Sequence, residues 1–236
     1  MNTPAPPTGA PLPHWRPPSR PERSPLQGCW CRLDPLTVDH AGELHEAACA
    51  DTTGHSWTYL PYGPFHSRSE YTTWIAERAD SRDPLFFAIV DAATGRAVGV
   101  ASYLRIDPAN GVIEVGHLYF SPALQGTTAA TEAMYLMMRH AFDLGYRRYE
   151  WKCDALNAPS RRAALRLGFQ FEGIFRQAVV VKGRNRDTAW FSVIDGEWPF
   201  LRTRFEKWLT PENFDTQGRQ LCPLSEIVPD CATQVR

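Results

Sequence analysis

The chain has 236 residues, of which 43% are hydrophobic, and its formal net charge is −1. This length and apolar content can fill the core of one domain and leave extensions. A net charge near zero gives no field that would draw the whole molecule to nucleic acid or to a membrane surface, and no apolar run reaches the ~20 residues that span a bilayer. We therefore expect neither nucleic acid nor a membrane as a partner.

The two ends of the chain are expected to lie outside the folded domain. Residues 1–27 contain nine prolines and few aliphatic side chains, so we expect a disordered, proline-rich leader at 1–28. The patterned domain runs over 29–209, and an irregular tail is expected at 210–236. The chain starts without the apolar segment of a signal peptide, which predicts a cytoplasmic protein. Its six cysteines lack zinc-type spacing, which predicts reduced thiols and no metal site.

The first half of the domain is predicted to contain two helices and a three-stranded meander. The expected elements are a helix at 41–50, a helix from Ser67 or Ser69 to about Arg78, and strands at 85–90, 96–106 and 112–121. Thr37 is expected to cap the first helix. Gly111 can take a positive φ, which predicts a hairpin turn at 107–111.

The second half alternates helices and strands. The expected elements are a helix that begins after the turn at 125–130, a strand at 148–156, a short helix from Ala158 to Gly168, a hairpin over 171–194 and a helix at 197–209. This order of elements predicts a mixed α/β domain.

The segment SPALQGTTAATEAM, residues 121–134, places small uncharged residues immediately before an apolar-periodic helix. Small side chains leave backbone N–H groups uncovered at a helix start, where the helix dipole also favours negative charge. The segment therefore predicts an anion-binding turn.

Three blocks of the sequence, in this order and spacing, resemble the GNAT acetyltransferases of the RimJ/RimL-like branch, which acetylates the N-terminal residues of proteins. The blocks are EVGHLYFSPALQGTTAATEAM, NAPSRRAALRLGFQFEGIFR and GRNRDTAWFSVIDGEW. The resemblance implies an α/β (α+β) fold, the GNAT acyl-CoA N-acyltransferase fold, whose mixed central sheet has splayed parallel strands flanked by helices. Those strands match 113–121 and 148–156.

The resemblance also implies acetyl-CoA as the donor, with its pantetheine arm between the splayed strands and its diphosphate on the turn. The cofactor-binding residues that it implies are Leu118, Tyr119, Phe120, Gln125, Gly126, Thr127, Thr128, Ala129, Ala130 and Asn157. The chain departs from the family pattern at Thr127 and Thr128, where a basic residue and a glycine are usual.

Glu114 is the expected general base. A carboxylate inside an apolar strand is costly unless it is paired or used, and an amine acceptor must lose a proton before it attacks the thioester. The alternative is a structural acid that pairs with Arg105 across the hairpin.

Ser160 is the expected acid for the departing thiolate, because the enzymes that the chain resembles have a serine there. It could instead satisfy backbone N–H groups at the start of its own helix. Asn157 is expected to orient the cofactor, and the backbone N–H near Leu118 to stabilise the oxyanion. His117 is expected to be a hydrogen-bonded structural residue, since strict alternation puts it on the face opposite Glu114.

Two further regions each allow two interpretations. The aromatic residues between the first two helices either line the acceptor site or pack locally; they are Trp57, Tyr59, Tyr62 and Phe65. The span 139–186 holds eleven Lys or Arg and four Asp or Glu. Arg161 or Arg162 in this span could attract the cofactor's phosphates or lie on a solvated face, and the hairpin tip at 182–186 could steer an acidic acceptor.

The sequence therefore predicts an N-acetyltransferase that moves an acetyl group from acetyl-CoA to a primary amine by direct attack in a ternary complex. The expected acceptor is a protein N-terminus or a small-molecule amine, and a homodimer stays open. One alternative is a non-catalytic acyl-CoA-binding sensor or assembly module, which the unusual Thr127–Thr128 turn would suit. A nucleic-acid-binding domain that uses the basic span is disfavoured by the net charge.

Overall fold

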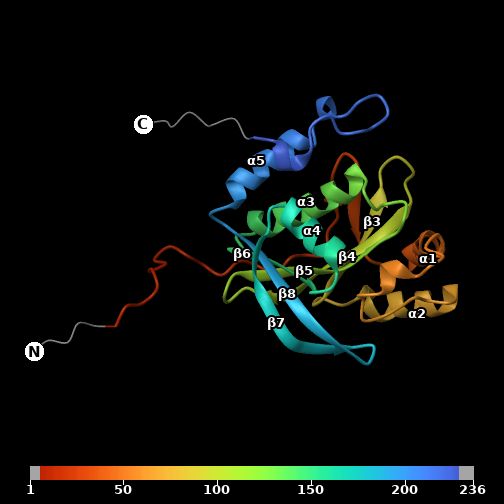
Figure 1. Ribbon diagram of the computed structural model, residues 1–236, viewed down its shortest axis with the longest axis horizontal. Helices are drawn as coiled ribbons and strands as arrows, with labels where there is room; N and C mark the ends of the chain where they lie inside the picture. Colours follow the sequence, from red (N-terminus) through yellow and green to blue (C-terminus); the bar gives the residue numbers. More distant parts are fainter. Residues whose placement is uncertain (1–5, 229–236) are drawn as a thin grey trace, which may run out of the picture.

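The protein forms one eight-stranded sheet with helices on both faces (Figure 1), in a computed structural model that describes residues 6–228. The strand order is β1-β2-β3-β4-β5-β6-β8-β7, and β5 and β6 are parallel while the other neighbours are antiparallel. The elements are β1 Leu26–Gln27, β2 Cys31–Pro35, α1 Ala41–Cys49, α2 Arg68–Ala79, β3 Leu85–Asp91, β4 Ala97–Asp107, β5 Val112–Phe120, α3 Thr128–Asp143, β6 Arg148–Asp154, α4 Ala158–Arg166, β7 Gln170–Val181, β8 Arg184–Ile194 and α5 Trp198–Trp208. The predicted mixed α/β fold is confirmed.

Each predicted helix and strand of the domain is present, with small differences at the ends. Ser67 caps α2 through its side chain, which accepts a hydrogen bond from the N–H of Glu70. Thr37 does not cap α1 directly, because one 3-10 turn, Val38–His40, intervenes. The hairpin of β1 and β2 was not predicted from the sequence, because β1 has two residues and β2 only five, although Cys31 and Leu33 of β2 alternate with polar residues.

Two hydrophobic cores lie on opposite faces of the sheet. Helices α3, α4 and α5 cover one face, and α1 and α2 cover the other (Figure 1). Because side chains alternate along a strand, Trp151 and Cys153 of β6 point into the core with α3, whereas Lys152 points to the face of α1 and α2. This alternation positions the two halves of the site described below.

The N-terminal segment is joined to the domain earlier than expected. The predicted boundary between residues 28 and 29 falls inside the β1–β2 hairpin. Before it, Arg23 donates to the carbonyl oxygens of Ala79 and Leu36, and Arg20 donates to that of Ile106. Residues 1–5 of the predicted disordered leader lie outside the described residues.

The predicted irregular tail contains two short 3-10 helices, Pro211–Asn213 and Leu224–Glu226, and returns Leu224 and Ile227 to the core beside α3. Residues 229–236 lie outside the described part. Within residues 6–228 the cysteines are free thiols, and no helix there has the length and apolar character required to cross a membrane.

A buried carboxylate on α3 holds the β1–β2 hairpin. Glu132 is 4% exposed, and its oxygens accept the backbone N–H groups of Cys29, Trp30 and Cys31 at 2.8, 2.6 and 2.8 Å. Replacing Glu132 with glutamine turns one acceptor oxygen into a donor that faces other donors. We expect Glu132→Gln to lower the free energy of unfolding by about 3 kcal/mol, measured by denaturant titration.

The matched control for this prediction is Glu46→Gln, since Glu46 is an exposed carboxylate paired with Arg96. It should change the free energy of unfolding by less than about 1 kcal/mol. Equal effects of the two substitutions would contradict the role given to Glu132.

Candidate active site

The parallel strands β5 and β6 separate halfway along their length. They pair only over Val112–Val115 and Arg148–Trp151. Beyond that point β5 stays paired with β4 and β6 stays paired with β8, so the backbones at 116–120 and 152–154 face each other without a ladder. A bulge opposite β4 bends β5 away, and His117 takes a φ of 51° there. The predicted splayed strands are confirmed.

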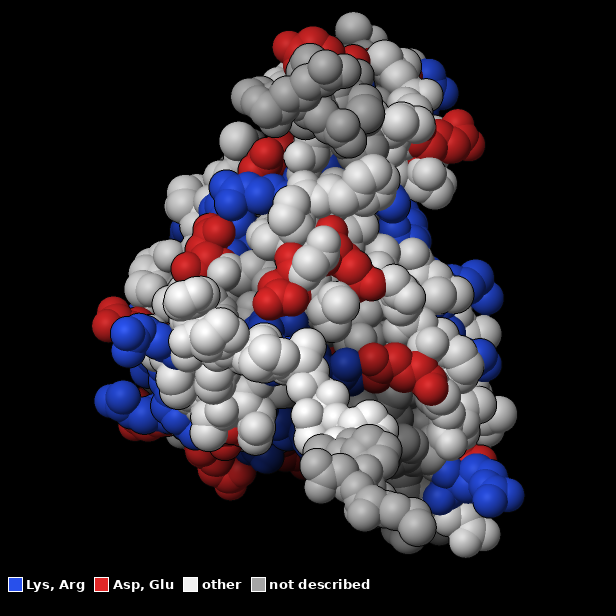
Figure 2. Space-filling model, turned by 90° about the vertical axis from the view of Figure 1, so that its left-hand side faces the viewer, with Lys and Arg blue, Asp and Glu red and all other residues white. Residues whose placement is uncertain are grey.

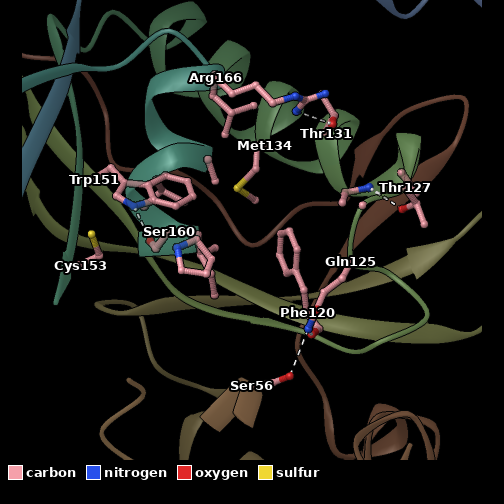
Figure 3. Close-up of a pocket in the computed structure, with 18 of the residues that line it drawn as sticks. Ser56, Phe120, Gln125, Thr127, Thr131, Met134, Trp151, Cys153, Ser160 and Arg166 are labelled. Carbon is pink, nitrogen blue, oxygen red and sulfur yellow. Dashed lines mark hydrogen bonds between the residues drawn. The ribbon is translucent and has the colours of Figure 1, made fainter. Parts of the chain in front are cut away.

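A cavity of about 1610 Å³ opens at this split. Its lining includes the end of β5, the start of α3, the end of β6, α4 and the loop before α2, together with the turns at 29–30 and 91–93 and the segment 214–220. Figure 3 shows Ser160 and Trp151 on one side of the cavity and Gln125 and Thr127 on the other, with Phe120 and Met134 between them. One cavity therefore joins the two parts of the site that the sequence predicts.

The start of α3 is shaped as an open turn. The Thr127 hydroxyl accepts the N–H of Ala130 at 3.2 Å and donates to the carbonyl of Leu124 at 2.7 Å, so Thr127 is the helix cap. Gly126 has a φ of 74°, and an added Cβ there would meet open space. The N–H groups of Thr128 and Ala129 have no helical carbonyl one turn earlier, so they can serve a bound anion.

The Gln125 side chain fixes this turn to the neighbouring elements. Its Nε2 donates to the carbonyl of Phe120 at 2.8 Å and to the Ser56 hydroxyl at 3.1 Å (Figure 3). Thr127, which stands where the family pattern usually has a basic residue, caps α3, and Gly126 before it leaves the turn open.

Nine of the ten residues proposed for the cofactor line the cavity. The exception is the side chain of Tyr119, which is 1% exposed and stacks on Trp57 with ring centroids 4.0 Å apart. Only the backbone of Tyr119 can therefore contribute. Asn157 lines the cavity, and its Oδ1 also accepts the N–H of Ser160 at 3.1 Å as the cap of α4.

Glu114 is a buried carboxylate at the cavity. It is 5% exposed, and Lys152 Nζ lies 2.6 Å and Arg105 Nε 3.4 Å from its Oε2. Burial raises the pKa of Glu114 above its ordinary value, and Lys152 opposes that rise. A raised pKa makes the carboxylate a better base toward an ammonium group.

The sequence analysis did not find Lys152. It belongs to the strand that runs parallel to β5, where Glu150 lies directly opposite Glu114. That register, once known, brings Lys152 to the same face as Glu114. The ion pair of Glu114 with Arg105, which the sequence offered as the alternative to catalysis, is present. The arginine side chain is 61% exposed, and its contact with Glu114 is longer than that of Lys152.

Ser160 does not satisfy backbone N–H groups of its own helix, because Asn157 is the cap of α4. Its Oγ instead accepts the indole N–H of Trp151 at 3.1 Å (Figure 3). Ser160 also lies beside Cys153, whose pKa is raised by burial and held back by the serine hydroxyl. The Ser160 hydroxyl thus contacts two cavity-lining residues, and its proton can turn from the Cys153 sulfur to a group bound in the cavity.

Glu114 and Ser160 approach the split from opposite faces of the sheet. Glu114 contacts Lys152, which lies on the face of α1 and α2, and Ser160 contacts Trp151, which points into the core with α3. Since Trp151 and Lys152 are consecutive residues at the end of the parallel ladder, the split is the passage between the two groups.

His117 lines the cavity as well, because the bulge breaks the alternation that separated it from Glu114. Its Nδ1 lies 3.2 Å from the Tyr62 hydroxyl and its ring stacks on that of Tyr62. Burial lowers the pKa of His117 to about 4, so the ring is neutral at neutral pH. The hydrogen-bonded structural role expected for His117 agrees with these contacts.

The aromatic residues before α2 divide between the two interpretations. Tyr59 lines the cavity, whereas the rings of Trp57, Tyr62 and Phe65 pack against Tyr71 and Trp74 in the second core; the ring contacts are Trp57–Phe65, Trp57–Tyr71, Tyr62–Trp74 and Phe65–Tyr71. Their neighbours His55, Ser56, Leu60 and Pro61 complete the cavity on this side.

The arginine of α4 that reaches the cavity is Arg166, while Arg161 and Arg162 are absent from its lining. Arg166 donates to the Thr131 hydroxyl at 3.1 Å, one turn into α3 (Figure 3). Arg161 points elsewhere, donating to the carbonyl of Ala155 and lying over the Phe171 ring. The helical period alone does not show that Arg166 reaches the cavity, because its contact with Thr131 depends on where α3 lies relative to α4.

Comparison with known proteins agrees with this geometry. The family model described as acetyltransferase (GNAT) domain matches residues 31–170, which is more than half of the chain. The chain belongs to the GNAT acetyltransferase family. The fold, the acetyltransferase class and acetyl-CoA as the donor, all expected from the sequence, are thereby confirmed at the level of the family.

Two solved structures are similar to this GNAT chain over most of its length. A GCN5-related N-acetyltransferase from Brucella melitensis is 51% identical, with a TM-score of 0.89, over 91% of this chain and 98% of that chain. A probable GNAT-family acetyltransferase from Chromobacterium violaceum is 42% identical, with a TM-score of 0.76, over 84% and 100% of the two chains.

Curated relatives match over shorter stretches. The ribosomal-protein-serine acetyltransferase of Escherichia coli is 35% identical over 82 residues, which are 34% of this chain and 45% of that protein. An uncharacterized N-acetyltransferase, p20, of Bacillus licheniformis is 31% identical over 48% of this chain and 63% of that protein. The matches thus span about half to two thirds of these relatives.

Proposed function

We propose that the protein transfers the acetyl group of acetyl-CoA to a primary amine by direct attack in a ternary complex. The observation that supports this most is the cavity through the split sheet, which has an amide-rich turn at its donor end and Glu114 on the acceptor face. A buried carboxylate beside the cavity, with its pKa raised by burial, favours this function over a non-catalytic acyl-CoA binder.

The donor, when bound, supplies an acetyl thioester, and the residues around the split supply the proton transfers. Glu114 accepts the proton of the acceptor's ammonium group, directly or through water, and leaves a nucleophilic amine. The backbone N–H near Leu118 stabilises the oxyanion that forms on the carbonyl. Ser160 donates its hydroxyl proton to the departing sulfur and takes up the proton that the attacking nitrogen loses as the amide forms, so the hydroxyl is restored. The indole N–H of Trp151 holds the serine oxygen in place for this relay.

The acceptor that we favour is the N-terminus of a protein. The similarity to an enzyme named ribosomal-protein-serine acetyltransferase supports this choice. We place the protein in the cytoplasm for the same reason. The homodimer left open by the sequence stays a prediction.

The test is a screen of short peptides and small amines in which release of free thiol from acetyl-CoA is measured. We expect peptides with a free N-terminus to release thiol and their N-terminally blocked forms to release none. Binding of acetyl-CoA without turnover on any amine would favour the non-catalytic binder instead.

Ser160→Ala is expected to lower kcat by about 100-fold, because the departing thiolate loses its proton donor. The dissociation constant of acetyl-CoA should stay within about threefold, since no cofactor charge is met by the hydroxyl. Stopped-flow thiol detection measures the first quantity and calorimetry the second. Ser69→Ala, an exposed serine on α2, is the matched control and should retain the full rate; a full rate for Ser160→Ala as well would remove Ser160 from this role.

A further inference from the structure

Strand β8 presents a row of unpartnered polar atoms to the acceptor face. Arg186, Thr188 and Trp190 alternate along the strand and therefore point to one side. Arg186 Nε, Thr188 Oγ1 and Trp190 Nε1 are all shielded from solvent, and none has a hydrogen-bond partner within residues 6–228. Buried polar atoms usually have a hydrogen-bond partner, so these three, in register on one strand, are available to a bound group or to water.

The register places this row on the same face as Glu114. Lys152 lies opposite Trp190, and its Nζ is 3.7 Å from the centre of the Trp190 ring and 2.6 Å from Glu114. Asp154 lies opposite Thr188, where β6 ends. Arg186 therefore continues the row past the end of β6, and its side chain lines the cavity.

Arg186 differs from Lys152 and Arg105, the two cations beside Glu114, in having no counter-ion among the described residues. Lys152 and Arg105 both pair with Glu114. Arg186 is half-buried and makes no ion pair with any carboxylate among the described residues. A half-buried guanidinium that lines a cavity without a counter-ion is a binding site for an anion, because guanidinium and carboxylate form strong charge-assisted hydrogen bonds.

The distance along β8 sets where that anion lies in the acceptor. Arg186 is four residues from Trp190, which is ~13 Å of extended strand. An arginine side chain that extends back along the strand toward Trp190 spans about half of that distance. The anion then lies one to three peptide residues from an amine placed at Glu114.

The β7–β8 hairpin is also fixed in place beside the acceptor loop. Lys182 at its tip donates to the carbonyls of Trp57 and Gly63 at 2.9 and 2.7 Å. Figure 1 shows the hairpin extending toward the helices of the same face. Arg186 is thus held on a strand whose far end is tied to the loop on the other side of the acceptor opening.

We propose that Arg186 binds a carboxylate that the acceptor carries within about three residues of its reacting amine. The acceptor class is therefore a peptide or protein with an acidic residue near its N-terminus. The inference rests on the proposed function and narrows its substrate. The formal net charge is −1, and charges of both signs are interspersed on the face shown in Figure 2. Recognition of the acid therefore depends on the local contact with Arg186 more than on the net charge of the molecule.

The experiment uses the full chain, acetyl-CoA and two series of amidated tetrapeptides. One series has Asp at position 2 or 3 after an N-terminal Ser, and the other has Asn at the same position. Thiol release gives KM and kcat for each peptide with the natural protein, Arg186→Gln and Arg184→Gln. Arg184 is the matched control because it lies on the same strand and face but is exposed to solvent and does not line the cavity.

With the natural protein, we expect kcat/KM for one Asp peptide to exceed that for its Asn partner by about 10- to 100-fold. Arg186→Gln should remove this preference by raising KM for the Asp peptide, with kcat and the dissociation constant of acetyl-CoA unchanged. Arg184→Gln should keep the preference.

Equal kcat/KM for Asp and Asn peptides in the natural protein, or a preference that survives in Arg186→Gln, would overturn the inference while leaving the proposed function intact. A weaker affinity of Arg186→Gln for acetyl-CoA would also overturn it and assign the arginine to the donor. No thiol release with any peptide would overturn the inference, and the proposed function would fall with it only if the small amines of the screen released no thiol either.

Discussion

Glu114→Gln is expected to lower kcat/KM for the amine by about 10²- to 10⁴-fold, the usual contribution of a general base. The amide keeps the size of the side chain but cannot accept the ammonium proton. Thiol release at saturating acetyl-CoA measures the loss. The affinity for acetyl-CoA should change little, because Glu114 lies on the acceptor face of the sheet.

The pH dependence separates this role from a structural one. Burial raises the pKa of Glu114 above its ordinary value, and the base works only when ionised. The rate of the natural protein should therefore fall as the pH drops through that raised pKa, and Glu114→Gln should lack this fall. An unchanged rate in Glu114→Gln would leave the pairs with Lys152 and Arg105 as its whole role.

Thr128→Glu is expected to weaken acetyl-CoA binding by about 100-fold or more, because it puts a carboxylate beside the amide groups that are proposed to hold the diphosphate. The same substitution should not harm the fold. An acid in the first turn of a helix is favourable by about 0.3–1 kcal/mol, so the melting temperature of the free protein should stay equal or rise.

Calorimetry with acetyl-CoA and a thermal melt of the free protein test both halves of this prediction. Thr73→Glu, an exposed threonine on α2, serves as the control and should bind acetyl-CoA as the natural protein does. If Thr128→Glu bound acetyl-CoA normally, the diphosphate would have to lie elsewhere, and the prediction that the turn at residues 125–130 binds it would be wrong.

The sequence predicted those parts of the site that depend on local pattern. The turn at residues 125–130 could be predicted to bind an anion because small residues before an apolar helix expose amide groups. Glu114 could be predicted as a site residue because its charge interrupts an apolar strand. The helices and strands followed from their periodicity and from glycine and proline positions.

The parts of the site that depend on strand register and on packing could not be predicted from the sequence. Lys152 reaches Glu114 only because β6 lies parallel to β5 with Glu150 opposite Glu114. The Tyr119 side chain leaves the cavity because the bulge at His117 turns it toward Trp57. The position of Arg186 depends on its passing the end of β6. One sequence does not fix such pairings, since they join segments far apart in the chain.

For Ser160 the sequence left two interpretations open, in which its hydroxyl either caps α4 or faces the thiolate. Asn157 caps α4, and Trp151 donates to the serine oxygen from the sheet side. The role of Ser160 toward the thiolate stays a prediction, which Ser160→Ala tests.

A crystal structure of the protein with coenzyme A tests the central claim most directly. We predict that the pantetheine arm lies between the backbones at 118–120 and 152–154 and that the diphosphate contacts the N–H groups at residues 126–130. Coenzyme A bound outside the split, or β5 and β6 joined by a continuous ladder in the complex, would contradict the account.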